Sequence, residues 1–507
     1  MENTIPKEVI DTGNALVACK HEAFIVGGCV RDLIIGVRPN DWDIATDASP
    51  DDIRKIFPDS VYENDFGTVG VKTDSDDQTL KMIEVTTFRA EGTYSDKRHP
   101  DEVKFVKTIE EDLSRRDFTI NAMAIDINPR ILSSKSNEIS KFAPPAGGQN
   151  SKLIRDPYDG QGDLNKKIIR AVGNPDERFE EDALRLLRAV RLSVQLGFSI
   201  EQHTKNALKK NSRLLKYIAK ERVRDEFQKL ILSERAADGI FRLEETGILE
   251  FIIPELREGI GCKQNKHHVY EVFEHNTRAL EYAARKGYSL EVRLASLLHD
   301  IGKPRTKRGQ NTEATFHGHE AVGARIAAAA LKNLRFSNDV IEKVRHLIRY
   351  HMFYYNVGEV SESGVRRFIA RVGVENIDDI LKVREADRIG SRVPKAFPYK
   401  LRHLLFMIEK VRHDPVHPKM LAVRGDDVMK ILGIPAGPKI GEILFILLDD
   451  VLDDPSLNTK EYLEKRVKDL GSLPGSKLAA LAGEGRRKRD SVEEEVEGEM
   501  KRKYFVE

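Results

Sequence analysis

The chain has 507 residues, enough for roughly three or four domains, and 40% of its residues are apolar. It has no apolar run near the roughly 20 residues that cross a bilayer and no basic-then-hydrophobic leader, so we expect a cytoplasmic protein without a membrane span or signal peptide. The 83 Lys and Arg residues nearly balance the 82 Asp and Glu residues, which excludes polyanion binding by overall charge and leaves only local basic patches. The three cysteines have no disulfide or metal-site spacing, as expected in a reducing compartment.

Hydrophobic periodicity divides the chain into two kinds of structure. Residues 1–130 mix helices with strand-like segments such as "AFIV", "DWDIAT", "KMIEVTTF" and "VKFVK". From about residue 175 onward the pattern is that of amphipathic helices, and 178–198 has the period of one long helix. We therefore predict an α/β head followed by a mostly helical body.

The first stretch with chemical potential is "GGCVRDLIIGVRPNDWDIAT", residues 27–46. In an extended segment side chains alternate, so Asp41 and Asp43 point to one face and Trp42 to the other. Paired carboxylates are ligands that Mg²⁺ prefers, and phosphoryl transfer uses such ions. Glu84, on a later strand that can run beside the first, is a third carboxylate. Taken alone, Asp-X-Asp is also typical of a surface turn.

The glycine pair follows the apolar strand directly. Gly27 and Gly28 would let a triphosphate approach backbone N–H groups at a helix start, with Arg31 adding a charged contact. The simpler interpretation of two adjacent glycines is a tight bend.

Four segments, 27–46, 83–126, 156–192 and 219–231, occur in an order that resembles one family. They are similar to the class II tRNA nucleotidyltransferases and bacterial poly(A) polymerases of the polymerase β superfamily, over residues 20–465. The resemblance implies a polymerase β-like head that transfers nucleotides from CTP and ATP to a tRNA 3′ end without a template. It also implies that Asp41 and Asp43 are Mg²⁺ ligands.

Two motifs of the head carry further roles by this resemblance. The polar stretch 90–102 resembles the loop that helps such enzymes change from C to A addition, although it equally suits a passive hairpin connection. Arg116 and Asp117 match a motif linked to nucleotide binding and head–neck motion, with Asp117 at the ribose; their alternative is a capped helix start.

Residues 132–152, rich in Ser, Pro and Gly, are predicted to form an exposed loop.

A template-free enzyme must select its nucleotide by protein side chains. Asp182 and Arg185, three apart, are expected on one face of the predicted helix. A carboxylate accepts from the exocyclic amine that cytosine and adenine share, and a guanidinium donates to the adjacent ring nitrogen. Uracil and guanine would leave polar groups unpaired, at about 1–3 kcal/mol each. The family's selecting motif matches "EDALR" here; the alternative is a surface ion pair. Arg188 and Arg191 extend the basic face.

A second constellation lies downstream. Its residues resemble the metal ligands of the HD phosphohydrolase superfamily: His275, His299, Asp300, His319, His351 and Asp387. His346 is an alternative to His351, and His317 is a weaker candidate beside His319. Imidazole and carboxylate groups together suit Ni²⁺, Mn²⁺ or Mg²⁺ with water as nucleophile. The alternative is a degenerate HD domain that only holds the tRNA body.

Near the C-terminus, the turn "GPKIG" precedes an amphipathic helix. Lys439 and the adjacent backbone N–H groups could contact phosphates, and a helix-turn-helix core element is an equally good interpretation. The last 25 residues carry blocks of one charge sign, which favours a solvated tail.

These patterns predict five segments: a nucleotidyltransferase head (1–150), a helical nucleotide-selecting neck (151–260), an HD metal-binding domain (261–395), a helical tRNA-contacting tail (396–470) and a charged, disordered end (471–507). The expected activity is CCA addition, with tRNA, CTP and ATP as partners, no membrane and no protein partner implied. The alternatives are a poly(A) polymerase, a CC- or A-adding enzyme, and an RNA-binding quality-control factor with a vestigial site.

Overall fold

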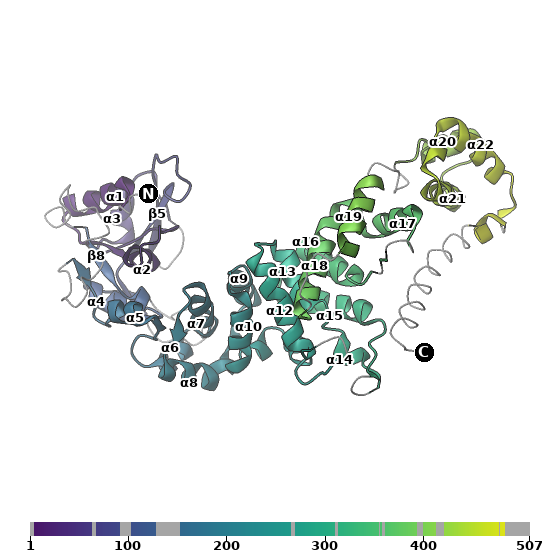
Figure 1. Ribbon diagram of the computed structural model, residues 1–507. Coiled ribbons are helices and arrows are strands. Elements are labelled where there is room, and N and C mark those ends of the chain that lie inside the picture. The colour runs from purple at the N-terminus through teal and green to yellow at the C-terminus, as the bar shows by residue number, and fades with distance from the viewer. Residues whose placement is uncertain are drawn as a thin grey trace. The chain divides into compact units, whose positions relative to one another are not determined.

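A computed structural model of the chain describes residues 5–62, 67–91, 103–127, 153–264, 269–309, 313–353, 355–356, 360–392, 399–411, 420–475 and 477–481. The chain forms two compact units, residues 1–254 and 255–507 (Figure 1). The predicted loop 132–152 lies outside the described residues, as do most of the stretch 90–102 and the charged end beyond residue 481.

The head is built on a mixed sheet, which confirms the predicted α/β class. Within the described residues the sheet has seven strands in the order β3-β4-β5-β2-β1-β8-β9, and only β2 and β5 run parallel. Their bounds are β1 Ala23–Val26, β2 Asp43–Thr46, β3 Val61–Tyr62, β4 Thr68–Lys72, β5 Met82–Thr87, β8 Ala124–Asp126 and β9 Ile154–Arg155. A separate hairpin joins β6 (Arg89–Glu91) and β7 (Val103–Phe105).

Short helices cover this sheet: α1 Lys7–Ala18, α2 Gly28–Ile34, α3 Pro50–Ile56 and α4 Ile109–Ser114. The strand β1 is buried along its whole length because it lies between β2 and β8 and has side chains on both covered faces. Phe24 and Val26 pack with Ala45, Phe88 and Leu113 in one core cluster. This core holds in place the end of the sheet where β1 ends at Val26 and β2 begins at Asp43.

The rest of the first unit is mostly helical, as predicted, with one short parallel strand pair, β10 Ile168–Ile169 and β11 Ser199–Ile200. It contains α5 Gly160–Lys166, α6 Pro175–Glu181, α7 Leu184–Gln195, α8 Gln202–Asn211, α9 Lys220–Ile231 and α10 Ala236–Glu245. The prediction of one continuous helix over 178–198 is wrong, because the chain breaks between α6 and α7. Asp182 is extended (φ −131°, ψ 102°), and its carboxylate accepts a hydrogen bond from the backbone N–H of Leu184 at 3.0 Å. That side-chain cap competes with the helical hydrogen bond, which apolar periodicity cannot register.

The second unit is helical in its described parts (Figure 1). Its helices are α12 Val272–Arg285, α13 Leu290–Leu298, α14 Lys303–Thr306, α15 His319–Asn333, α16 Asn338–Tyr350, α17 Glu362–Val372, α18 Ile377–Gly390, α19 Tyr399–Val411, α20 Gly425–Leu432, α21 Pro438–Asp453 and α22 Lys460–Gly471. Helices α12 and α18 touch backbone to backbone at Gly390, where a Cβ would lie 2.9 Å from the His275 carbonyl oxygen. Among the described residues, every helix is too short or too polar to cross a bilayer.

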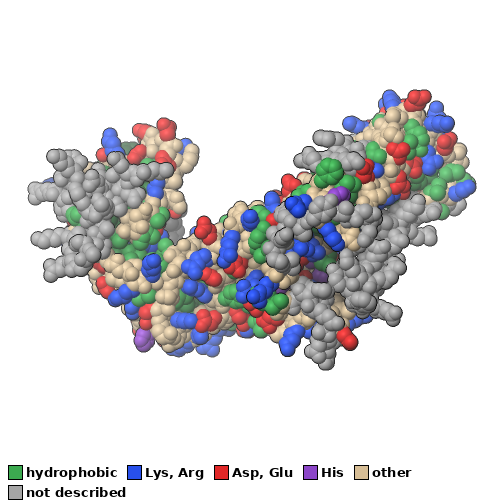
Figure 2. Space-filling model, in the orientation of Figure 1, with side chains coloured by type: hydrophobic (Ala, Val, Ile, Leu, Met, Phe, Trp, Pro, Cys, Tyr) green, Lys and Arg blue, Asp and Glu red, His purple; other side chains and the backbone are tan. Residues whose placement is uncertain are grey.

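Two surface expectations can be compared with the structure. On the face shown in Figure 2, Lys and Arg side chains are interspersed with Asp and Glu, in keeping with the near-zero net charge. Lys439 donates a hydrogen bond to the Gly471 carbonyl at 2.9 Å, at the end of α22. The core-element interpretation of the "GPKIG" turn is therefore favoured over a phosphate contact.

Candidate active site and metal centre

Three carboxylates lie at one end of the parallel strand pair of the head. Asp43 opens β2 and stands in register beside Glu84 of β5, so that both side chains leave the same face of the sheet. Trp42 is buried and Asp41 is exposed, as the alternation predicted. Burial raises the pKa of Asp43, the Arg116 guanidinium opposes this, and the neighbouring Asp41 carboxylate adds to it. A hard divalent cation would stabilise such a set of oxygen ligands in its ionised form, so these residues fit Mg²⁺.

The glycine turn brings basic groups to the same place. Gly27 has a left-handed backbone (φ 83°), and a Cβ there would lie 3.0 Å from Nη1 of Arg116 and 3.2 Å from Oδ2 of Asp43. Gly28 begins α2, and a Cβ there would lie 3.4 Å from Nη2 of Arg31. The structure therefore brings Asp43, Arg116 and Arg31 around a turn whose backbone has no side chains in the way.

Arg116 and Asp117 are held by two different partners. Arg116 donates to the buried Asp112 carboxylate at 3.0 Å. Asp117 accepts from the backbone N–H of Phe118 at 2.8 Å and from Nε and Nη2 of Arg188 at 2.8 and 2.6 Å. Although burial opposes ionisation, the Arg188 guanidinium and the Asn121 amide lower the pKa of Asp117 to about 2. Asp117 thus joins the head to α7. The alternative of Asp117 as a helix cap is not found, because the short 3₁₀ helix Thr119–Asn121 follows Phe118 and has no side-chain cap.

The two base-selecting candidates contact different charged residues. Asp182 accepts from Nη2 of Arg222 on α9 at 2.9 Å. Arg185, which is buried, lies 2.6 Å from Glu181 and donates to the Arg115 carbonyl at 2.9 Å. Asp182 and Arg185 are only three residues apart in the sequence. Because the chain breaks between α6 and α7, they do not lie on one helical face. In the structure each side chain has an ion-pair partner on another residue, Arg222 for Asp182 and Glu181 for Arg185.

The two arginines expected to extend the basic face of α7 both have carboxylate partners. Arg188 pairs with Asp117, and Arg191 pairs with the buried Glu226 of α9. Helix α9 packs against α7. It supplies Glu226, the partner of Arg191, and Arg222, the partner of Asp182. Sequence reasoning did not single out these two residues. Their spacing of four on one predicted helix, within "ERVRDEF", was the available signal.

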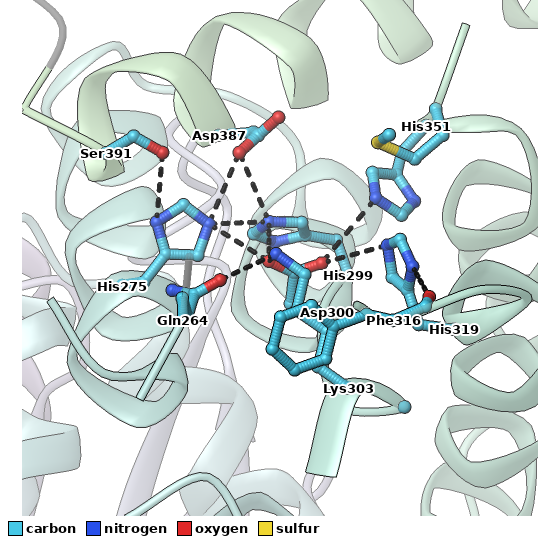
Figure 3. A network of polar contacts seen from close by, with 12 residues as sticks. Gln264, His275, His299, Asp300, Lys303, Phe316, His319, His351, Asp387 and Ser391 are labelled. Carbon is cyan, nitrogen blue, oxygen red and sulfur yellow. Dashed lines mark hydrogen bonds and ion pairs between the residues drawn. The ribbon is translucent and has the colours of Figure 1, made fainter. Parts of the chain in front are cut away.

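In the second unit, six predicted metal ligands converge (Figure 3). They come from five separate places: α12, the end of α13, the start of α15, the end of α16 and α18. Nε2 of His275 lies 3.0 Å from Nε2 of His299 and 3.3 Å from oxygens of both Asp300 and Asp387. Nε2 of His319 lies 3.2 Å from Oδ1 of Asp300, and Nε2 of His351 lies 3.8 Å from the same oxygen.

Three of the imidazoles are oriented by backbone carbonyls. Nδ1 of His299, His319 and His351 lies 2.9, 2.7 and 2.7 Å from a carbonyl oxygen three residues earlier in the chain. This contact leaves each Nε2 directed toward the carboxylates, which is how metal-binding histidines are usually held. His346 instead contacts the Val372 carbonyl oxygen, and His317 is exposed. Of the two alternatives, His351 is the residue brought into the centre.

The electrostatics of this centre fit a cation. The Lys303 ammonium and the His299 imidazole outweigh burial and hold the pKa of Asp300 well below its usual range. Although burial opposes its charged form, Asp300 raises the pKa of His299 to about 10. Burial, with His299 and His319 beside it, lowers the pKa of His351 to about 3. Two groups of three ligand atoms, each within 4.8 Å of one another, are formed: His275, His299 and Asp387, and His299, Asp300 and His351.

Two residues that the sequence reasoning did not single out complete this centre. Nζ of Lys303 lies 2.6 Å from Oδ2 of Asp300 and donates to Oε1 of Gln264 at 2.7 Å (Figure 3). Lys303 is the last residue of the "HDIGK" segment. Its position three residues after Asp300 was the available signal that it could contact that carboxylate. Gln264 lies on the irregular segment before α12 and had none.

Family models match the parts of the chain that contain the two sites. Residues 23–170 match the family model of the poly(A) polymerase head domain. Residues 197–260 match the model described as the probable RNA and SrmB-binding site of polymerase A, and residues 272–389 match the HD domain.

Similar whole proteins are also known. The chain is 33% identical over 440 residues to an A-adding tRNA nucleotidyltransferase of Deinococcus radiodurans, which covers 84% of this chain and 91% of that protein. It is 32% identical over 451 residues to a CCA-adding enzyme of Ligilactobacillus salivarius, covering 89% and 93%. A crystal structure of the Bacillus stearothermophilus CCA-adding enzyme in complex with CTP matches with a TM-score of 0.66 and 28% identity, covering 91% and 96%.

Proposed function

The chain belongs to the tRNA nucleotidyltransferase family, and within it we propose that this protein is a CCA-adding enzyme that adds C, C and A to tRNA 3′ ends from CTP and ATP. The observation that carries the proposal is the register of Asp43 beside Glu84, next to Asp41 and the Gly27 turn. This register brings the acidic metal ligands next to a turn whose backbone carries no side chains. A bound triphosphate would need both features at one place.

We assign roles in the head accordingly. Asp41, Asp43 and Glu84 would hold Mg²⁺, which when bound stabilises the charge that develops on a transferred phosphate. The backbone of Gly27 and Gly28, with Arg31 and Arg116, binds the triphosphate. The tRNA 3′-OH then attacks the α-phosphate and pyrophosphate leaves.

Base selection is assigned to Asp182 and Arg185, with Asp117 at the ribose. In this assignment Asp182 accepts from the exocyclic amine of C or A while Arg185 donates to the ring nitrogen. Arg222 already donates to Asp182 and orients its carboxylate. Arg185 must exchange its contacts with Glu181 and the Arg115 carbonyl for the base edge. Arg188 holds α7 against Asp117, so that closing the head and selecting the base involve the same helix.

The specificity among family members is a narrower question. A relative named as A-adding and others named as CCA-adding match the chain at similar identity, and a poly(A) polymerase is the further alternative. Incubating the protein with tRNAs that lack CCA, CA or A, with each nucleotide alone and in mixture, and reading product lengths separates these activities. An RNA-binding factor with a vestigial site would give no product.

A second activity is proposed for the HD centre. The observation that favours it is the convergence of Nε2 of His299, His319 and His351 on Asp300, with His275 and Asp387 completing the ligand set. Ni²⁺, Mn²⁺ or Mg²⁺ bound there would activate water for hydrolysis of phosphate esters. Hydrolysis of 2′,3′-cyclic nucleotides and phosphomonoesters, with chelation as the control, tests this activity. A domain that only holds tRNA would hydrolyse none of them.

We propose the same five-segment division for these roles: head 1–150, neck 151–260, HD domain 261–395, tRNA-contacting tail 396–470 and charged end 471–507. Cytoplasmic action is proposed with it. Cys19, Cys29 and Cys262 are free thiols, as a reducing compartment would favour.

A further inference from the structure

A cavity of about 230 Å³ opens on the second unit, and no residue that lines it belongs to the metal centre. Helix α12 contributes Arg278, Tyr282 and Arg285 to its wall, and Tyr270 precedes that helix. Ile389 and Arg392 come from the end of α18 and the residues just after it.

Positive charge dominates this cavity. Three guanidinium groups line it against one carboxylate, that of Glu281, which pairs with Arg285. The guanidinium carbon of Arg278 lies 4.3 Å from the centroid of the Tyr270 ring, and Nη2 of Arg278 donates to Glu274 at 2.7 Å. Arg392 is exposed, and among the described residues its side chain has neither a hydrogen bond nor an ion pair. An anionic ligand would meet at least one uncompensated guanidinium here.

The walls of the cavity are held by buried contacts. The Tyr282 hydroxyl donates to the buried Glu385 carboxylate at 3.0 Å. The Tyr270 carbonyl accepts from Gln264 at 3.1 Å, and Gln264 in turn accepts from Lys303 at 2.7 Å. A cavity whose wall is fixed before binding loses little conformational entropy when a ligand enters.

We propose that this cavity binds a nucleotide, with its phosphate held by Arg285 and Arg392 and its base packed on Tyr270, Tyr282 and Ile389. Planar guanidinium groups match the geometry of phosphate oxygens, and aromatic rings with arginine planes are the usual partners of an unstacked base. The nucleotide comes either from a single-stranded RNA segment or from the free pool. The RNA source rests on the proposed function, whereas the binding chemistry does not.

The cavity shares two helices with the metal centre. Helices α12 and α18 carry His275 and Asp387 of the metal centre as well as the cavity wall. Ser391, next to Arg392, lies 3.4 Å from Nδ1 of His275 (Figure 3). An RNA strand held in the cavity is therefore held beside the metal centre, on the same two helices.

Photo-crosslinking of the full chain tests the proposal. The probes are 8-azido-ATP and a single strand of about ten nucleotides that contains 4-thiouridine, a length that one strand-binding groove can accommodate. Mass spectrometry of the crosslinked peptides should place at least one probe in residues 269–285 or 389–392. A crosslink from the RNA that excess ATP does not displace identifies RNA as the source, and the reverse pattern identifies free nucleotide. Crosslinks from both probes confined to other segments would overturn the proposal.

Charge-reversed variants supply the control. Arg285→Glu combined with Arg392→Glu should lower the crosslink yield in the cavity by about tenfold, because two phosphate contacts are lost. Arg345→Glu on α16 removes a comparable exposed ion pair, with Glu342, outside the cavity and should leave the yield unchanged. Equal yields in the two variants would refute the site. CCA addition is assayed in the same preparations: its absence with an intact cavity crosslink would contradict the proposed function alone.

Discussion

Asp43 of β2 stands directly beside Glu84 of β5 in the one parallel strand pair of the described head sheet. Because the two residues share a register position, their carboxylates leave the same face, next to the Gly27 turn.

Gly27→Ala should remove nucleotide addition. Gly27 has φ 83° and ψ −142°, a conformation that is essentially restricted to glycine and costs about 1–3 kcal/mol with a side chain, and the new Cβ would also displace Arg116 and Asp43. Gly173→Ala is the matched control, since Gly173 has φ 64° and open space around it. Gly27→Ala should lose at least as much free energy of unfolding as Gly173→Ala, because only its Cβ meets other atoms, and only Gly27→Ala should lose incorporation of CTP and ATP. Equal activity in the two would show that the turn only connects two elements.

Arg185→Lys should relax nucleotide selection. A lysine keeps the charge but cannot present the planar pair of donors, so discrimination of CTP over UTP should fall by about tenfold, the value of one unpaired polar group. Arg178→Lys is the control, because Arg178 also contacts Glu181 but is not assigned to the base. Single-turnover incorporation of each nucleotide measures the ratio. An unchanged ratio with lower stability would make Arg185 a structural residue.

Asp117→Asn should lower the free energy of unfolding by about 2–3 kcal/mol at pH 7, since the pKa of Asp117 in the folded protein is about 2, roughly two units below its unfolded value. A lowered carboxyl pKa stabilises the fold above the unfolded pKa near 4, and that stabilisation is lost as the pH falls toward 2. The difference between variant and wild type should therefore be about half as large at pH 3 as at pH 7. Chemical unfolding of both proteins, with the exposed Asp225→Asn as control, measures it. A difference independent of pH would contradict the Asp117–Arg188 account.

The sequence predicted some of these contacts and not others, for identifiable reasons. Strand alternation was sufficient to separate the buried Trp42 from the exposed Asp41, and "MIEVTTF" was sufficient to put Glu84 on a strand. The α6–α7 break was missed because it depends on one side-chain cap at Asp182, and a cap changes no apolar periodicity. The salt bridges of Arg188 and Arg191 were missed because they depend on which helix packs against α7.

The grouping of the metal ligands could not be predicted from local sequence patterns either. The ligands span residues 275 to 387 on five elements, so no local pattern could have assembled them, and their grouping rested on resemblance to HD proteins. The choice of His351 over His346 required the helix end that turns its Nε2 inward. Gln264 became visible only through its contact with Lys303.

His299→Ala or Asp300→Ala should abolish metal-dependent phosphate-ester hydrolysis and metal retention while sparing CCA addition, because the two sets of ligands lie in different units. His346→Ala, which removes a histidine outside the centre, should change neither. Bound metal is measured by mass spectrometry of the purified proteins and hydrolysis on 2′,3′-cyclic nucleotides. A wild-type protein that retains no metal and hydrolyses no substrate would refute the second activity.

The most direct measurement of the central claim is the 3′-end sequence of a tRNA that lacks CCA after incubation with CTP and ATP. We expect C, C and A to be added in that order and addition to stop there, with C alone added when only CTP is supplied. The Asp41→Asn and Asp43→Asn variants should bind the tRNA and add nothing, because each loses a metal ligand. Addition of long runs of A, addition of A only to a tRNA that already ends in CC, or activity in either variant would contradict the account.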